Sequence, residues 1–151
     1  MFTKILVPID GSPLARNAAK AAVELARLLH AEIVAFEVTP KYIMHVLEDS
    51  MVAPGMLSED EFNAQIAKRS AKYLGEIDEI ARAAGVPFKG TTAPSQHIAA
   101  AIVDAAKTHG CDLIFMGSHG RGNIAQIFLG GVTTKVLSLT ALPVLVHRGG
   151  T

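Results

Sequence analysis

A glycine-rich part of the chain has the residue types that bind phosphate groups. Gly117, Gly120 and Gly122 lie close together, and Gly130 and Gly131 stand just before an expected short helix. Successive backbone N–H groups in such a segment can form an anion-binding nest, and a helix N-terminus adds unpaired N–H groups and a positive dipole end. The glycines could have no role beyond forming tight turns, but the presence of two such clusters favours binding of a polyphosphate.

Other phosphate-binding and catalytic motifs do not fit the sequence. A P-loop needs Lys and then Ser or Thr after its last glycine, whereas Gly122 is followed by Asn123 and Ile124. The first turn, residues 9–13, lacks the glycines of a dinucleotide-binding fingerprint. The sequence also has no Gly-x-Ser-x-Gly nucleophile elbow and no His-Glu-x-x-His zinc pair.

Strand-like and helix-like patterns alternate along the whole chain. Ser12 is a good N-cap for a first helix ending near Leu29, and Ser58 with Glu61 forms a capping box that opens a second. Strict alternation predicts an α/β fold, a Rossmann-like open sheet of five parallel strands with helices on both faces. The strands are expected at residues 4–8, 31–38, 86–93, 111–116 and 142–147, a third helix opens at Pro94, and the last helix spans 133–140.

Composition narrows the class of protein. The 151 residues suit a single domain, 1–151, and half of them are hydrophobic while 19% are charged. Fourteen basic and fourteen acidic residues give a net charge of zero, which gives no sign of a nucleic-acid partner. No apolar stretch approaches the roughly 20 residues of a membrane helix. With one cysteine, Cys111, and no leader before the first strand, we expect a cytoplasmic protein without membrane insertion.

Two segments stand where ligands bind in this fold class. Open α/β sheets bind ligands beyond the carboxyl ends of their strands. Pro8–Ser12 follows the first strand, and Gly117–Gly122 follows the fourth. Apart from these two segments, residues 40–57 form a long and fairly apolar connection, and connections of this kind often serve as lids or binding loops.

The chain resembles the universal stress protein family nearly from end to end. The resemblance rests on Ile5–Ser12, on Leu113–Gly122, and on Leu129–Val132 followed by Leu142–Val146. It implies a five-stranded parallel sheet of order 3-2-1-4-5 and a homodimer. Leu142–Val146 would lie at one edge of that sheet, where an exposed apolar strand favours pairing with the same strand of a second copy.

One branch of that family binds ATP through the motif Gly-x2-Gly-x9-Gly-Ser/Thr. Gly117, Gly120 and Gly130 fit its spacing, but Gly131 replaces the Ser or Thr and removes a hydroxyl expected to touch the terminal phosphates. The backbone N–H remains, and Thr133 is close enough in sequence to contribute. The resemblance therefore implies weaker triphosphate contact, with ATP as the ligand, ADP or AMP as alternatives, and Mg²⁺ left open as a companion ion.

The family's binding positions carry over to this sequence residue by residue. Asp10 should meet the ribose or the adenine side, although it could also be a turn residue. His119 could hold its own loop, and Arg121 could be a solvated surface charge. The implied site consists of Pro8, Ile9 and Asp10, the backbone of Val38 against adenine, Met116 and Gly117 at the ribose, His119, Gly120, Arg121 and Gly122 near the phosphates, and Gly130, Gly131, Val132 and Thr133 at the outer phosphates.

Three functions remain open from the sequence. The leading one is a regulatory stress-response protein whose nucleotide occupancy stabilises or switches a dimer. A slow ATPase is the second, although only Asp10 and His119 are obvious candidates for a base or a metal contact. The third is a nucleotide-free dimeric scaffold that acts through residues 40–57 on an unnamed client protein.

Overall fold

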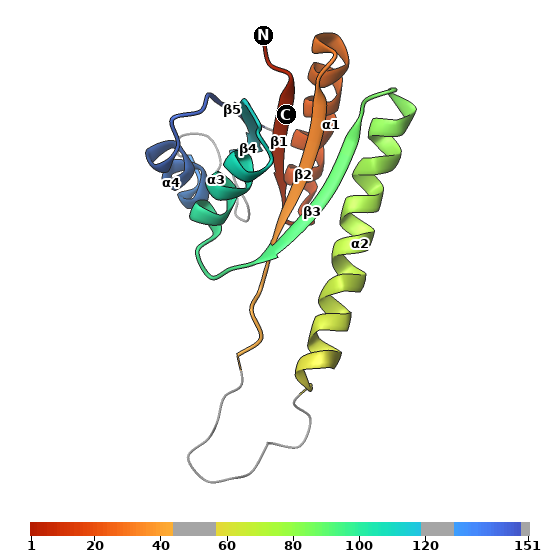
Figure 1. Cartoon of the computed structure of the whole chain (residues 1–151), viewed down its shortest axis with the longest axis vertical. Helices are drawn as coiled ribbons and strands as arrows, with labels where there is room; N and C mark the ends of the chain where they lie inside the picture. The colour runs from red at the N-terminus through yellow and green to blue at the C-terminus, as the bar shows by residue number, and fades with distance from the viewer. Residues whose placement is uncertain (44–56, 119–128, 149–151) are drawn as a thin grey trace.

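The computed structural model describes residues 1–43, 57–118 and 129–148, and confirms the expected sheet. Five parallel strands lie in the order β3-β2-β1-β4-β5. Helices α1 and α2 cover one face, and α3 and α4 cover the other (Figure 1). The elements are β1 (Lys4–Ile9), α1 (Pro13–Leu29), β2 (Glu32–Thr39), α2 (Glu59–Ala83), β3 (Phe88–Pro94), α3 (Ile98–Thr108), β4 (Leu113–Gly117), α4 (Gly131–Leu139) and β5 (Val144–His147).

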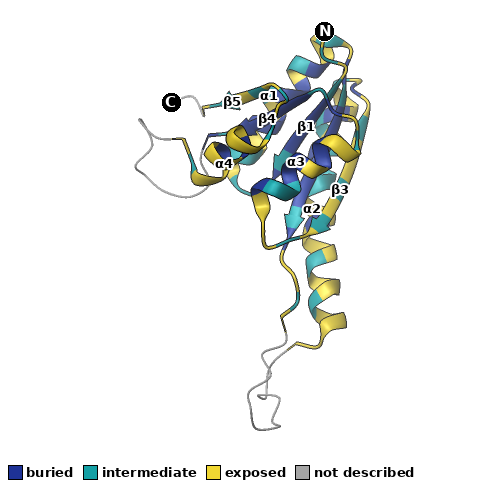
Figure 2. Ribbon diagram, turned by 60° about the vertical axis from the view of Figure 1, so that its left-hand side comes forward, coloured by how far each residue is buried: buried dark blue, intermediate teal, exposed yellow. Residues whose placement is uncertain are grey.

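The apolar strands are buried from both sides, as their continuous hydrophobic runs predict. In β1, Ile5 and Val7 pack with α1 and α2, while Leu6 between them packs with α3. The ribbon is accordingly darkest along the middle of the sheet (Figure 2). Cys111 is buried too, and burial raises the pKa of its thiol to about 11, so it behaves as a small hydrophobic residue.

Two helix boundaries differ from those expected. Pro94 does not open α3, because it is still paired with Thr39 in the β2–β3 ladder, and the N–H of Ser95 donates to the Thr39 carbonyl. The helix then begins at Ile98. Helix α4 begins at Gly131, two residues earlier than expected, because Gly130 acts as its N-cap. No helix in the described ranges is long and apolar enough to cross a membrane.

The ladder between β1 and β4 ends early because of Pro8. The Lys4 carbonyl accepts from the N–H of Asp112 on the β4 side, whereas the Thr3 carbonyl accepts from the N–H of Glu32 in β2. Even-numbered residues of β1 therefore turn their main-chain groups toward β4. Pro8 is one of them and has no N–H, and the paired residues stop at Leu6 and Ile114. Beyond this point no residues of β1 and β4 are paired in the described part of the chain.

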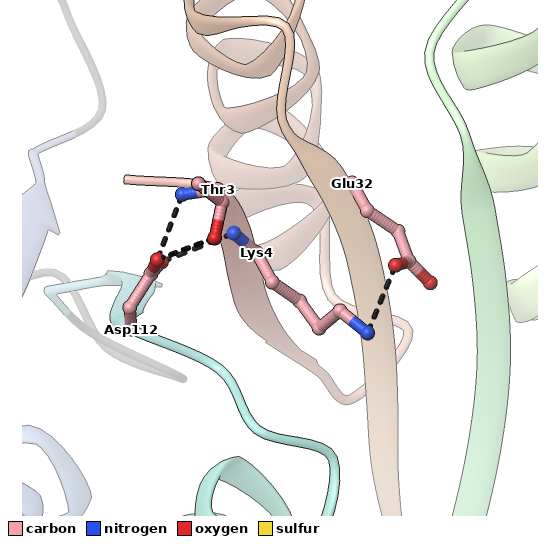
Figure 3. A network of polar contacts seen from close by, with 4 residues as sticks. All are labelled: Thr3, Lys4, Glu32 and Asp112. Atoms are coloured by element: carbon pink, nitrogen blue, oxygen red, sulfur yellow. Dashed lines mark hydrogen bonds and ion pairs between the residues drawn. The ribbon is translucent and has the colours of Figure 1, made fainter. Parts of the chain in front are cut away.

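A carboxylate holds the other end of β1 against β4. Asp112 accepts hydrogen bonds from the N–H and hydroxyl of Thr3, both at 2.8 Å, and from the N–H of Lys4 at 3.0 Å (Figure 3). Lys4 Nζ lies 3.0 Å from Glu32 of β2. Burial opposes ionisation of Asp112, but these hydrogen bonds outweigh it and keep the pKa of its carboxyl below the ordinary 3.8.

We expect Asp112→Asn to reduce the free energy of unfolding at pH 7 by about 1 kcal/mol, because the carboxylate is only partly screened from water. Since folding depresses the pKa, its contribution is present above pH 3.8 and is lost as pH falls through the lower folded-state value. The variant should therefore lose less stability than the parent between pH 5 and pH 2. Urea unfolding at several pH values measures this. Asp104→Asn, an exposed carboxylate on α3, is the control, and equal acid sensitivity of parent and Asp112 variant would contradict the assignment.

Candidate functional site

A cavity of about 230 Å³ lies at the carboxyl edge of the sheet, where the ends of β1, β2 and β4 meet the first turns of α3 and α4. The connections from β1 and β4 leave the sheet toward opposite faces, so this is the switch point at which open α/β sheets bind ligands. The lining consists of Pro8, Ile9, Asp10, Ser12, Ala15, Phe36, Val38, Ile98, Ile102, Met116, Gly117, Gly130, Gly131, Val132 and Thr133.

Sequence-predicted site residues from four separate segments meet in this cavity. They are Pro8, Ile9 and Asp10 from β1 and its loop, Val38 from β2, Met116 and Gly117 from β4, and Gly130, Gly131, Val132 and Thr133 from the start of α4. His119, Gly120, Arg121 and Gly122 lie outside the described residues, as do positions 44–56 of the long connection.

The β1–α1 loop presents Asp10 at the rim of the cavity. Asp10 Oδ1 accepts a hydrogen bond from the N–H of Ser12 at 2.9 Å, which forms a tight side-chain-closed turn. Ser12 Oγ in turn accepts from the N–H of Ala15 at 3.1 Å and caps α1. The turn uses one carboxylate oxygen of Asp10, and the side chain remains exposed toward the cavity mouth.

The end of β2 offers main-chain groups to the cavity. The N–H of Glu32 donates to Thr3 beside β1, whereas the N–H of Ile33 donates to Pro87 beside β3. Even-numbered residues of β2 thus face β1. Val38 is one of them, and it lies one residue beyond Glu37, the last residue of β2 paired with β1. Its carbonyl consequently faces the space that opens where β1 turns away.

The first turn of α4 faces the same space and is tied to the end of β4. The N–H of Gly130 donates to the Ser118 carbonyl at 2.7 Å, and Thr133 Oγ1 donates to the Gly117 carbonyl at 3.1 Å. The first helical hydrogen bond of α4 is that of Thr134 to Gly130. The N–H groups of residues 131–133 precede it, so this helix start can accept an anion.

The position of Gly131 has room for a side chain. A Cβ built there would meet no atom of the described residues within 4 Å, so steric exclusion by them does not explain the glycine. Thr133 is buried and its hydroxyl proton is already engaged by Gly117. The described start of α4 therefore offers backbone N–H groups, rather than hydroxyl protons, to a ligand.

Sequence reasoning missed the apolar wall of the cavity. Phe36 lies two residues before Val38 on the same face of β2, and Ile98 and Ile102 lie one turn apart on α3. The alternation of a strand and the i, i+4 spacing of a helix could have indicated all three. Asp10 is the one ionisable side chain of the described lining, and no three His, Cys, Asp or Glu side chains gather as a metal site anywhere in the described ranges.

Comparison with known proteins gives the family. The model of the universal stress protein family matches residues 1–148. The universal stress protein YxiE of Bacillus subtilis is 33% identical over 157 residues, covering 98% of this chain and all of the relative. The structure of MJ0577, a universal stress protein of Methanocaldococcus jannaschii, superposes with a TM-score of 0.80 at 27% identity, covering 100% of this chain and 99% of the other.

Two further solved structures share the fold at lower identity. A universal stress protein in complex with cAMP has a TM-score of 0.73 at 20% identity and covers 99% of both chains. A universal stress protein from Archaeoglobus fulgidus in complex with dAMP has a TM-score of 0.66 at 20% identity and covers 95% of this chain and 96% of the other. With the family match over nearly its whole length and the shared strand order, the chain belongs to the universal stress protein family.

Proposed function

We propose that this universal stress protein binds an adenine nucleotide, foremost ATP, in the cavity at the carboxyl edge of the sheet. One observation carries the proposal: separate segments of the chain, each singled out for nucleotide binding, line a single cavity at the switch point of the sheet. Two relatives of the same fold were solved with cAMP and dAMP, which are both adenine nucleotides.

The lining suggests how the nucleotide lies. The base fits between the apolar side chains of Phe36, Ile98 and Ile102, with its polar edge toward the main chain of Val38. Asp10 at the rim suits a ribose hydroxyl, since a carboxylate is a hydrogen-bond acceptor. The phosphates then extend to the first turn of α4, whose N–H groups at residues 131–133 and dipole favour negative charge.

The biological role that we propose is regulatory. Nucleotide binding stabilises the folded protein in proportion to the logarithm of ligand concentration over its dissociation constant, and it shifts a conformation only when two states bind it differently. We propose that the protein is a cytoplasmic homodimer formed through β5. Nucleotide binding changes its stability or conformation, and this change regulates a stress response.

The edge position of β5 supports this dimer. The N–H of Ile114 donates to Pro143 and that of Ser118 to His147, so odd-numbered residues of this strand face β4. The main-chain groups of Val144 and Val146 therefore point outward from the sheet edge. Leu145 leaves 38% of its surface exposed, and antiparallel pairing with a second β5 would satisfy the edge and cover apolar surface.

The first test is the content of the purified protein. Protein isolated without added nucleotide, then denatured, should release ATP, ADP or AMP near one per chain, identified by mass spectrometry. Ile98→Glu should weaken ATP binding by at least about tenfold, because it sets a carboxylate in the apolar wall. Leu28→Glu, at an exposed leucine of α1, is the matched control. An empty parent protein whose Tm ignores added ATP would refute the proposed function.

A second test adds the hydroxyl that the phosphate end lacks. We expect Gly131→Ser to tighten ATP about tenfold, the value of one hydrogen bond to a charged group, and to change AMP binding less. Gly75→Ser on α2, where a Cβ also meets nothing within 4 Å, controls for the substitution itself. Isothermal titration with ATP and AMP measures both constants. An equal gain for the two nucleotides would show that residue 131 does not face the outer phosphates.

A third test concerns assembly. Leu145→Arg should convert a dimer to a monomer at micromolar concentration, because it sets two like charges near each other at the paired edge. Sedimentation velocity reads the mass, with Leu28→Arg as the control for an added surface charge. A monomeric parent, or a Leu145 variant that remains dimeric, would count against pairing through β5.

A further inference from the structure

A tyrosine on the opposite face of the sheet lies directly against the loop that presents Asp10. Gly11 has φ of +76°, a conformation that few other residues adopt. A Cβ at this position would overlap Cζ of the Tyr73 ring and lie 2.7 Å from its hydroxyl oxygen. The tyrosine ring of α2 thus occupies the space that a side chain at position 11 would need.

The packing between this ring and the loop is close. The hollow bounded by Gly11, Ser12, Arg16 and Tyr73 retains only about 10 Å³ of space. Arg16 of α1 forms an ion pair with Glu76 of α2 across the same hollow. The loop therefore has the cavity on one side and a filled contact with α2 on the other.

The ring is itself held in place from β2. The Arg69 guanidinium lies 6.0 Å from the centre of the Tyr73 ring, and it donates to Glu37 Oε1 at 3.0 Å. Glu37 is only 2% exposed, and its other oxygen has no hydrogen-bond partner among the described residues. Loss of Arg69 would leave a buried carboxylate unpaired, so this contact resists displacement.

We infer that Tyr73 is a positioning residue for the nucleotide site, acting through Gly11 on Asp10. The inference rests on the proposed function. Asp10 and Ser12 flank Gly11 and are joined by the 2.9 Å hydrogen bond that closes the turn, so a shift of Gly11 toward α2 displaces the carboxylate from the cavity rim. The ring acts as a stop that prevents this shift. Tyr73 sets ribose recognition in this way without touching the ligand.

Three variants of α2 test the inference. Tyr73→Ala removes the ring, and Tyr73→Phe keeps it. Leu74→Ala removes a neighbouring side chain that packs on β3 instead of on the loop, since a Cβ at Gly90 would lie 3.2 Å from Leu74. Leu74→Ala therefore controls for loss of stability without loss of the Gly11 contact. The readouts are amide hydrogen exchange of Ser12 in the ligand-free protein, and the ratio of dissociation constants for 2′-deoxy-AMP and AMP.

For the parent we expect AMP to bind about tenfold tighter than 2′-deoxy-AMP, because one ribose hydroxyl hydrogen-bonds to a carboxylate. Tyr73→Ala should bring the ratio toward one and speed exchange at Ser12, whereas Tyr73→Phe and Leu74→Ala should keep both parental values even where Tm falls. A parental ratio and parental exchange in Tyr73→Ala would overturn the inference. So would a parent that binds both nucleotides equally, although the proposed function would then stand. A parent that binds neither of these nor ATP would overturn both.

Discussion

The missing N–H of Pro8 is the constraint on which the architecture of the site depends. Alternate residues of an inner strand normally bond to the same neighbour, and Pro8, one of the β1 residues that face β4, has no N–H to donate. The pairing of the two central strands therefore stops at Leu6 and Ile114, before either strand ends. The cavity lies just beyond this point, where the connections from β1 and β4 leave toward opposite faces and the first turns of α3 and α4 add their residues to the lining.

The opposite end of the same strand pair is held together by side-chain hydrogen bonds. Asp112 gathers three donors from Thr3 and Lys4, and Lys4 reaches across to Glu32. Strand β1 is thus tied to β4 at its start, whereas its last residues pair with β2 alone. A fold arranged in this way can keep a cavity at one edge of its sheet without loosening the apolar core on which its stability depends.

Most of the fold could be read from the sequence because each element carries its own signal. The continuous apolar strands, the Ser12 cap and the Ser58–Glu61 capping box act over a few residues, and the structure has them where local physics predicts. The start of α3 was misplaced, since Pro94 has the residue type of a helix start but is held in the sheet by pairing with Thr39. Long-range pairing overrode a local preference there.

The candidate site was only partly predictable for the same reason. The glycines and Asp10 have residue types that suggest ligand binding. Phe36 and Ile102 are apolar like other core residues, and only the structure shows that they line the cavity. The contact of Tyr73 with Gly11 joins residues far apart in the chain, and nothing in the spacing of α2 marks it. The hydrogen bond from the Thr133 hydroxyl to the Gly117 carbonyl likewise depends on tertiary structure and could not be predicted from the sequence.

The length of α2 has a mechanical consequence. The helix runs from Glu59 to Ala83, its buried residues are Ser70, Ile77 and Ala81, and its first turns extend past the edge of the sheet (Figures 1 and 2). Tyr73 stands about 20 Å along the axis from the tip of the helix. With a fulcrum at Tyr73, a tilt of about 5° would move that tip by about 2 Å. A small rotation of the helix at the ring that contacts Gly11 therefore corresponds to a much larger movement of the end that projects into solvent.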